Sequence, residues 1–229
     1  MIIGGFLKMT VLDFPEKIAC ILFTYGCNFK CPFCHNSRLV IKEAESFSEE
    51  EIFAYLKKRR GVLDGVCISG GEPLIHGEEI FSLMRKIKDM GFLIKLDTNG
   101  YFPSHLKYVI DNSLVDYVAM DIKNCKEKYA QTAGLDHIDI SKIEQSVDIL
   151  INGNVDYEFR TTVTRELHTP DDFAKIGEWI KGARKYYIQN FVDSGELIEN
   201  ISSPLDLQGL KALLDAVSPY VESASIRGE

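Results

Sequence analysis

The feature that most constrains the fold is a regular alternation, along the chain, of short β-rich runs with stretches of helical periodicity. Such alternation is typical of repeated βα units, whose strands pair in parallel within a sheet. It predicts an α/β protein, either a partly closed (β/α)6 barrel or an open doubly wound sheet, and periodicity alone does not distinguish the two. In both, ligands bind at the carboxyl ends of the strands. The six predicted strands are 18–24, 65–69, 92–98, 116–122, 156–163 and 186–192.

The predicted helices between these strands carry signals at their starts. Two pairs of residues have the spacing of a capping box, in which the first side chain caps the helix and the fourth bonds back to it. Two other sites place a capping residue before a proline in the first helical turn. The four predicted starts are Ser48 with Glu51, Ser141 with Glu144, Thr169 with Pro170, and Ser203 with Pro204.

Apolar residues recur at three-and-four spacing in two of these helices, which predicts faces that pack on the sheet. The basic run 57–60 follows an amphipathic stretch, and we expect it at a helix C-terminus, where cations complement the helix dipole. The two apolar faces are Ile80, Leu83, Met84 and Ile87 in one helix, and Phe173, Ile176 and Ile180 in the other.

Length and composition favour one compact domain over residues 1–229. Of these 229 residues 45% are hydrophobic, and no polar linker rich in Gly and Pro interrupts the middle of the chain. No apolar run approaches the roughly 20 residues that span a bilayer, and the N-terminus lacks a secretory pattern, so we expect a soluble cytoplasmic protein without a membrane partner. The net charge of -8 and the scattered Lys and Arg residues argue against a nucleic acid partner.

Three cysteines stand directly after the first predicted strand, spaced as Cys27-x3-Cys31-x2-Cys34. Three thiolates hold three irons of a cubane cluster and leave the fourth iron open to a small molecule. The alternative is a zinc site with His35 as fourth ligand, which is disfavoured because adjacent side chains do not easily converge on one ion. The remaining cysteines lie in apolar surroundings and are expected to be buried free thiols. They are Cys20, Cys67 and Cys125.

Polar residues also follow the next three predicted strands. The second strand runs into SGGEP (69–73), where paired glycines let the backbone approach a ligand and Glu72 offers a carboxylate to an ammonium group. An ordinary turn is the alternative. The third and fourth strands end in LDTNG and AMDIK, so we expect Asp97, Asp121 and Lys123 at the same edge of the sheet, unless they are merely solvated.

The cysteine spacing in the first βα loop, with an aromatic residue inside its last interval, resembles the radical S-adenosylmethionine superfamily. The resemblance implies a partial (β/α)6 barrel and one 4Fe-4S cluster. It implies that the amino and carboxylate groups of S-adenosylmethionine chelate the open iron. By the same likeness Phe33 lies against the adenine, with loop packing as its alternative role. Gly71 and Glu72 would hold the amino group, within a cofactor-binding motif that includes Gly70.

LDTNG, the D-x-K strand end and the Cys-His-Asn after the cluster resemble the glycyl-radical enzyme activases. That likeness implies that Asp97, Thr98 and Asp121 hold a monovalent cation beside the cosubstrate carboxylate, with the Ala119 carbonyl completing the site. It implies that Lys123 contacts the ribose or the carboxylate.

By the same resemblance, two further residues match positions that bind the cosubstrate in the family. Arg160 would be directed at the cosubstrate carboxylate, where its guanidinium fork suits bidentate pairing. Gln189 would reach the adenosine from the sixth strand. No side chain is expected to act as acid or base, because the cofactor carries the chemistry.

Over essentially the whole chain the likeness extends to activating proteins of anaerobic ribonucleoside-triphosphate reductases of the longer type, through GGFLKMTVLDFPEKIACILFTYGCNFKCPFCHN and the terminal SIRG. It implies an oxidoreductase that cleaves S-adenosylmethionine and generates a glycyl radical on a partner enzyme, with electrons from reduced flavodoxin or ferredoxin. Only residues 37–48 separate the cluster loop (25–36) from the next helix, so we expect a single cluster, and residues 202–229 form a C-terminal extension.

Two alternatives stay open. One is radical chemistry on a small molecule in cofactor or modified-nucleoside biosynthesis. The other is a non-catalytic metal-binding or electron-transfer module.

Overall fold

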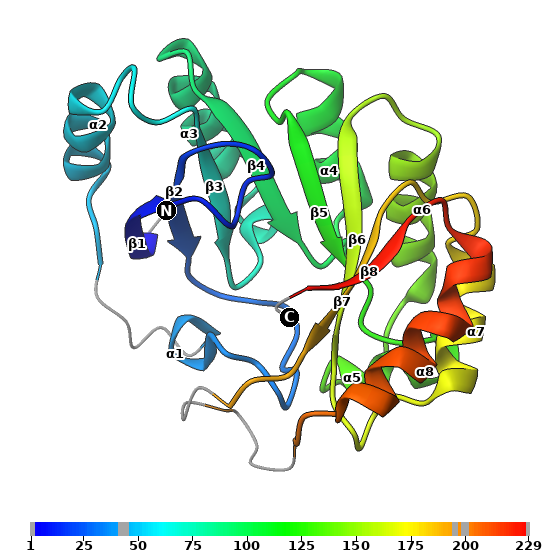
Figure 1. The fold of residues 1–229 in the computed structure, drawn as a ribbon. Coiled ribbons are helices and arrows are strands. Elements are labelled where there is room, and N and C mark those ends of the chain that lie inside the picture. The colour runs from blue at the N-terminus through cyan, green and yellow to red at the C-terminus, as the bar shows by residue number, and fades with distance from the viewer. Residues whose placement is uncertain (1–2, 41–45, 194–196, 198–201, 228–229) are drawn as a thin grey trace. The chain divides into compact units, whose positions relative to one another are not determined.

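The computed structural model describes residues 3–40, 46–193, 197 and 202–227 (Figure 1). In this part of the chain eight strands form a sheet in the order β1 to β8, which is also their order along the chain. β1 runs antiparallel to β2, whereas β2, β3 and β4 are mutually parallel, as are β6, β7 and β8. The strands are β1 (Ile3–Thr10), β2 (Ala19–Thr24), β3 (Gly65–Gly70), β4 (Leu93–Thr98), β5 (Tyr117–Asp121), β6 (Asp156–Val163), β7 (Tyr186–Asn190) and β8 (Ala224–Arg227).

The six predicted strands correspond to β2 through β7, each with ends within two residues of the prediction. This confirms the α/β class and the mostly parallel sheet. A doubly wound sheet reverses its strand order at a switch point. The order here follows the chain without reversal, as in a barrel-type fold.

The two outer strands, β1 and β8, are not among the predicted strands. The second and third residues of β1 are glycines, and a Cβ at Gly4 would lie 2.6 Å from Leu39 Cδ2 and 2.8 Å from Tyr25 Cε1. These glycines therefore allow a close approach to neighbouring side chains, but they weaken the local strand signal. β8 is short and pairs with β7, so its strand conformation depends on a partner far away in the sequence.

Helices lie between consecutive parallel strands. The α-helices are α1 (Ser37–Val40), α2 (Glu49–Lys58), α3 (Glu78–Asp89), α4 (Pro103–Asp111), α5 (Tyr129–Thr132), α6 (Ile140–Ile151), α7 (Pro170–Trp179) and α8 (Leu207–Val217), and the 3-10 helices are η1 (Pro73–His76), η2 (Lys126–Lys128) and η3 (Ser218–Tyr220). The two predicted apolar faces are buried in α3 and in α7 with its C-cap residue. The basic run ends α2, as predicted.

Two of the four predicted helix starts are confirmed. Ser48 forms a capping box with Glu51 at the start of α2, and Thr169 caps α7, where Pro170 occupies the first turn. The Thr169 box closes through Asp172, a residue that the sequence analysis did not name.

The other two predicted starts are wrong. α6 begins after Asp139, and the hydroxyl of Ser141 donates to Asp139 Oδ1 at 2.6 Å instead of capping the helix. α8 begins after Asp206, whose Oδ1 accepts from Gly209 N at 2.8 Å. Ser203 N donates to Glu166 Oε2 at 3.0 Å, so tertiary contacts hold this segment ahead of the helix.

The chain divides into two compact units, each assembled from several stretches. Unit 1 comprises Met1–Asn28, Arg38–Thr98 and Ser104–Val118, and unit 2 comprises Phe29–Ser37, Asn99–Pro103 and Ala119–Glu229. The single domain over residues 1–229 stays a prediction.

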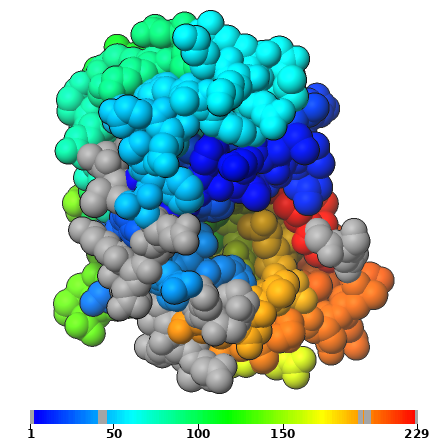
Figure 2. Space-filling model, turned by 90° about the vertical axis from the view of Figure 1, so that its left-hand side faces the viewer, coloured from blue at the N-terminus to red at the C-terminus, as the bar shows by residue number. Residues whose placement is uncertain are grey.

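In unit 1 an apolar cluster covers one face of β2 and β3. Phe14, from the turn between β1 and β2, lies in this cluster with its ring centroid 6.2 Å from that of Tyr117. Gly65 makes room for it, because a Cβ there would lie 2.8 Å from Phe14 Cε1. At the surface of the same unit, β1 lies below α2 (Figure 2) and exposes Leu7 and Met9.

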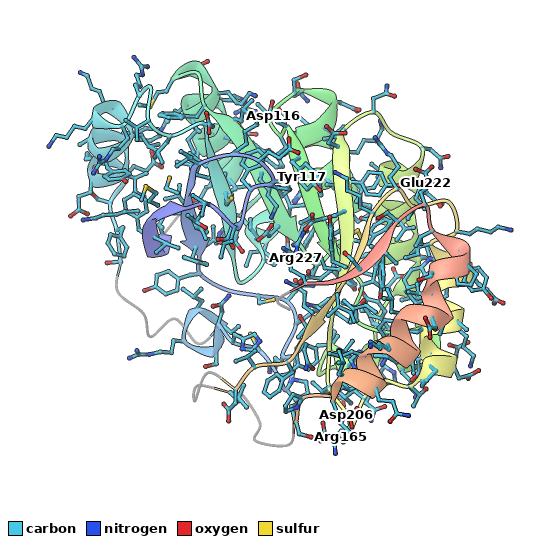
Figure 3. The ribbon with its side chains drawn as sticks, in the orientation of Figure 1. Asp116, Tyr117, Arg165, Asp206, Glu222 and Arg227 are labelled. Carbon is cyan, nitrogen blue, oxygen red and sulfur yellow. The ribbon has the colours of Figure 1, made fainter. Side chains whose placement is uncertain are left out.

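In unit 2 helices α7 and α8 pack side by side (Figure 1). Gly177 lets α7 approach η3, because a Cβ at this position would lie 2.4 Å from the Tyr220 ring. Arg165, just after β6, and Glu222, just before β8, lie at opposite ends of the strands of this unit (Figure 3). Among the described residues, none of the helices combines the length and the apolar character needed to cross a bilayer.

Candidate active site

The cysteine loop follows β2 directly, as predicted. Cys27 belongs to unit 1 and is half-buried, whereas Cys31 (buried) and Cys34 (half-buried) belong to unit 2. Cys34 N donates to the carbonyl of Cys31 at 3.0 Å, so the last interval is a tight turn. None of these three cysteines is part of a disulfide, and three thiols on one short loop fit the donor set of a cubane cluster.

The zinc alternative needs ligands around a single point. Within the described residues, no group of three or more His, Cys, Asp or Glu side chains is arranged to hold one metal ion. His35 stacks on Phe191, with ring centroids 5.6 Å apart. The cysteines of a cubane, by contrast, bind separate irons.

Cys31 lies in a setting that works against its thiolate form. Burial raises the pKa of the Cys31 thiol to about 11, while the positive charge of Lys123 opposes this shift. Iron binds the thiolate, so a cluster held here would displace the thiol proton, and the ammonium of Lys123 would favour that release.

A turn of unit 2 holds the middle of the cysteine loop. Lys30 N donates to the carbonyl of Ala133 at 2.9 Å. Gly134 has a φ of +68°, and a Cβ at this position would lie 2.0 Å from the carbonyl oxygen of Lys30. Only glycine therefore allows this turn to contact the backbone next to Cys31. Gly134 is not among the predicted site residues, because it is distant from the cysteines in sequence.

The glycines of the second loop pack against the first loop within unit 1. Gly71 N donates to Thr24 O at 3.0 Å, and Glu72 N donates to Gly26 O at 2.8 Å. A Cβ at Gly71 would lie 1.9 Å from Gly26 O, and Gly70, with φ of +119°, would place one 2.3 Å from Thr24 N. The glycine pair thus joins the loop that follows β3 to the start of the cysteine loop.

Glu72 has a structural role that sequence analysis missed. Its carboxylate is buried and accepts hydrogen bonds from Leu74 N at 3.0 Å and from the hydroxyl of Thr98 at 2.8 Å. It thereby caps η1 and links the loop after β3 to the end of β4. Contact between Glu72 and an ammonium ligand stays a prediction.

At the end of β4, Asp97 pairs with a lysine from its own strand. Lys95 Nζ forms an ion pair with Asp97 Oδ1, and the side chain of Lys95 is 1% exposed. Lys95 is not among the predicted site residues, although a lysine inside an otherwise apolar strand two residues before an aspartate is a recognisable signal.

In unit 2 the end of β5 forms a charge cluster. Asp121 accepts from Lys123 Nζ through Oδ2 and from Arg160 Nε through Oδ1, both at 3.0 Å. Burial by itself raises the pKa of the Asp121 carboxyl, but the charges of Lys123 and Arg160 and their hydrogen bonds lower it to about 2. Burial lowers the pKa of Lys123, but the charges of Asp121 and Cys31 raise it above its usual value, so its ammonium stays charged. The structure therefore brings Asp121, Lys123 and Arg160 together.

Three further predicted residues occupy defined positions. Phe33 is buried within the cysteine loop, and Ala119 is buried in β5. Gln189 lies in β7, opposite Thr162 of β6 in the strand register. Because alternate residues of a strand share a face, Gln189 lies on the same face of the sheet as Arg160.

The same face carries an ion pair that the sequence analysis did not identify. Arg227 of β8 (Figure 3) donates to both carboxylate oxygens of buried Glu158, at 2.8 and 2.9 Å, and lies over the ring of Tyr187 at 3.9 Å. This contact ties the terminal strand to β6 and β7, next to Arg160 and Gln189 in the register.

Comparison with known proteins defines the class. The model of the Radical SAM superfamily matches residues 21–180, so the chain belongs to this superfamily and is a radical SAM enzyme. The family implies a 4Fe-4S cluster and S-adenosylmethionine.

Within this superfamily, curated relatives of the chain are named as glycyl-radical enzyme activating enzymes. A Methanocaldococcus jannaschii protein provisionally named as such an enzyme is 31% identical over 99% of this chain and 95% of its own length. The pyruvate formate-lyase-activating enzyme of Clostridium pasteurianum is 28% identical over 51% of this chain and 50% of its own length.

Solved structures share the fold. A domain of pyruvate-formate lyase-activating enzyme from Bacteroides vulgatus has a TM-score of 0.59 at 16% identity, covering 72% of this chain and 99% of that chain. Native anSMEcpe with bound AdoMet has a TM-score of 0.61 at 21% identity, covering 89% of this chain and 62% of that chain.

Proposed function

We propose that this protein generates a glycyl radical on a partner enzyme, and that the partner is an anaerobic ribonucleoside-triphosphate reductase. The observation that carries the general role is the relative named as a glycyl-radical enzyme activating enzyme, which aligns with 99% of the chain. The choice of partner rests on the resemblance of the opening segment and the terminal SIRG. We place the protein in the cytoplasm, with reduced flavodoxin or ferredoxin as its electron donor.

In this proposal Cys27, Cys31 and Cys34 hold the cluster. When bound, the cluster would supply one electron from the external donor for cleavage of S-adenosylmethionine to methionine and a 5′-deoxyadenosyl radical, which would take a hydrogen atom from a glycine Cα of the partner. This role is supported by the three thiols, none of which is part of a disulfide. It is also supported by the backbone contacts of Gly134 and Gly71 with the cysteine loop, because these contacts hold the loop in a defined conformation.

The remaining residues bind and orient the cosubstrate. Lys123 and Arg160 provide charges for its carboxylate or ribose, and Asp121 holds both side chains in position through its two hydrogen bonds. We assign Phe33 and Gln189 to the adenosine part, and Gly70, Gly71 and Glu72 to the amino group. These residues exclude water and fix the geometry, and none of them moves a proton.

A second candidate function is radical chemistry on a small molecule. It is favoured by one relative, the 7-carboxy-7-deazaguanine synthase of Koribacter versatilis, which is 28% identical over 62% of this chain and 59% of its own length. The shorter match and the lower identity make this candidate weaker than the activating role.

The decisive experiment uses the anaerobically reconstituted protein with a reductant and S-adenosylmethionine. We expect 5′-deoxyadenosine from the wild type and none above background from Cys31→Ala, with Cys125→Ala as a matched control because Cys125 is a buried thiol outside the cysteine loop. With a purified anaerobic ribonucleotide reductase we expect a protein-bound radical doublet by electron paramagnetic resonance. Cleavage without radical transfer would contradict the proposed partner, and unchanged cleavage by Cys31→Ala would contradict the cluster assignment.

A further inference from the structure

Lys95 is a buried ammonium group beside a residue expected to bind a cation. Its side chain is 1% exposed, and its Nζ pairs with Asp97 Oδ1. In the strand register Lys95 lies opposite Cys67, a member of the apolar cluster of unit 1. The stem of Lys95 thus extends from apolar surroundings toward the end of β4. A lysine in such a position is tolerated when its charge is paired, and Asp97 provides the pairing.

The other side chains expected to bind the cation also have partners of their own. The hydroxyl of Thr98 donates to Glu72 at 2.8 Å. The two oxygens of Asp121 accept from Lys123 and Arg160. Each pairing lies within one unit, so none depends on how the units are arranged.

The charges around these carboxylates also disfavour a bound cation. The two carboxylates expected to bind a cation, Asp97 and Asp121, already face three cationic side chains of the chain itself: Lys95, Lys123 and Arg160. A sodium or potassium ion on these carboxylates would meet like charges at close range. The residues therefore do not fit the cation that the resemblance implies.

We infer that Lys95 replaces the monovalent cation of this site. Its ammonium neutralises Asp97 and fixes the carboxylate in one orientation at the end of β4, as a bound ion would do. Lys95 is in this sense a positioning residue for cosubstrate binding. The inference rests on the cosubstrate site proposed above and is independent of the identity of the partner enzyme.

The inference predicts that cosubstrate affinity does not depend on the monovalent cation in solution. The test is equilibrium dialysis of S-adenosylmethionine against the anaerobically reconstituted protein, in potassium, sodium and tetramethylammonium chloride at equal ionic strength. We expect the wild-type Kd to agree within about twofold in the three salts. A loss of tenfold or more in tetramethylammonium would overturn the inference without any variant.

Lys95→Met removes the charge and keeps most of the stem. In tetramethylammonium we expect at least a tenfold weaker Kd, with recovery to within about threefold of wild type in potassium or sodium, because a small cation can then enter beside Asp97. A purely structural role would weaken binding equally in all salts, and that result, or unchanged binding in tetramethylammonium, would contradict the inference. The matched control is Lys107→Met, whose partner Asp111 is exposed, and it should bind like the wild type.

If Lys95→Met does not fold, as judged by circular dichroism, the double variant Lys95→Met, Asp97→Asn leaves no unpaired charge. We expect it to bind weakly and without salt dependence, whereas recovery in potassium would contradict the role of Asp97. Absence of binding by the wild type in every salt would contradict the proposed function, and this inference with it. Binding of S-adenosylmethionine without radical transfer would contradict only the proposed partner enzyme and not the inference about Lys95.

Discussion

At the scale of single residues, Asp121 shows how neighbouring charges outweigh burial. Burial favours the neutral carboxyl group, yet Lys123 and Arg160 lower its pKa to about 2. A carboxyl whose pKa is depressed by folding stabilises the folded state above its usual pKa of 3.8, and this contribution is lost as the pH falls toward 2.

We therefore expect Asp121→Asn to change the pH dependence of stability. The free energy of unfolding of the apoprotein, measured with urea, should fall by about 1 kcal/mol more for the wild type than for the variant between pH 6 and pH 3. The reason is that only the wild type has this carboxyl group to protonate. Asp111→Asn is the control, since Asp111 is exposed and pairs with the exposed Lys107. If the free energy of unfolding changes equally with pH in the wild type and in Asp121→Asn, Asp121 is not the group that causes the acid destabilisation.

At the scale of elements, helix starts were predictable where the cap is local. Ser48 and Thr169 close capping boxes through residues three positions later, so the short segment contains all the partners. Ser203 also has a capping residue type before a proline, but a tertiary contact with Glu166 holds it outside α8. A local signal fails where a distant partner competes for the same side chain.

The turn at Gly134 carries a prediction about the cysteine loop. Gly134→Ala would place a Cβ 2.0 Å from Lys30 O, so the backbone next to Cys31 must shift. We expect iron and sulfide bound after anaerobic reconstitution to fall by at least half. The matched control is Gly182→Ala, because Gly182 has a φ of +87° with nothing within 4 Å of the added Cβ.

Both alanine variants carry a backbone strain of about 1 kcal/mol from the left-handed conformation. Gly134→Ala also meets the carbonyl oxygen of Lys30, so its melting temperature should drop further than that of Gly182→Ala. Only Gly134→Ala should lose iron. A full complement of iron in Gly134→Ala would mean that the turn does not position the cysteine loop.

At the scale of the whole molecule, the division into two units bears on how the chain unfolds. Unit 2 contains Trp179, in α7, which is the sole tryptophan of the 229-residue sequence. Tryptophan fluorescence therefore reports on unit 2, whereas far-ultraviolet circular dichroism reports on the strands and helices of both units.

If the chain is one domain, as its composition predicts, both signals should follow a single urea transition with the same midpoint. β5 supports this outcome, because its residues are shared between the two units. A second transition seen by circular dichroism and absent from the fluorescence of Trp179 would show that the units unfold independently.

The sequence by itself determined the six central strands, the apolar helix faces and the position of the cysteines in the first βα loop. Each of these follows from a pattern within a short segment, namely apolar runs, three-and-four spacing and cysteine spacing. The pairing of Asp121 with Lys123 could also be predicted from the sequence, because the two residues are close in sequence.

Tertiary structure alone decided the strand conformation of β1 and β8, the burial of Glu72 against Thr98, the bond of Arg227 to Glu158, and the contact of Gly134 with Lys30. Their partners lie far apart along the chain, and whether two such groups meet depends on the packing of whole elements. A local pattern can place a charge or a glycine in the sequence, but only the packed sheet determines which distant group balances that charge or occupies the space beside that glycine.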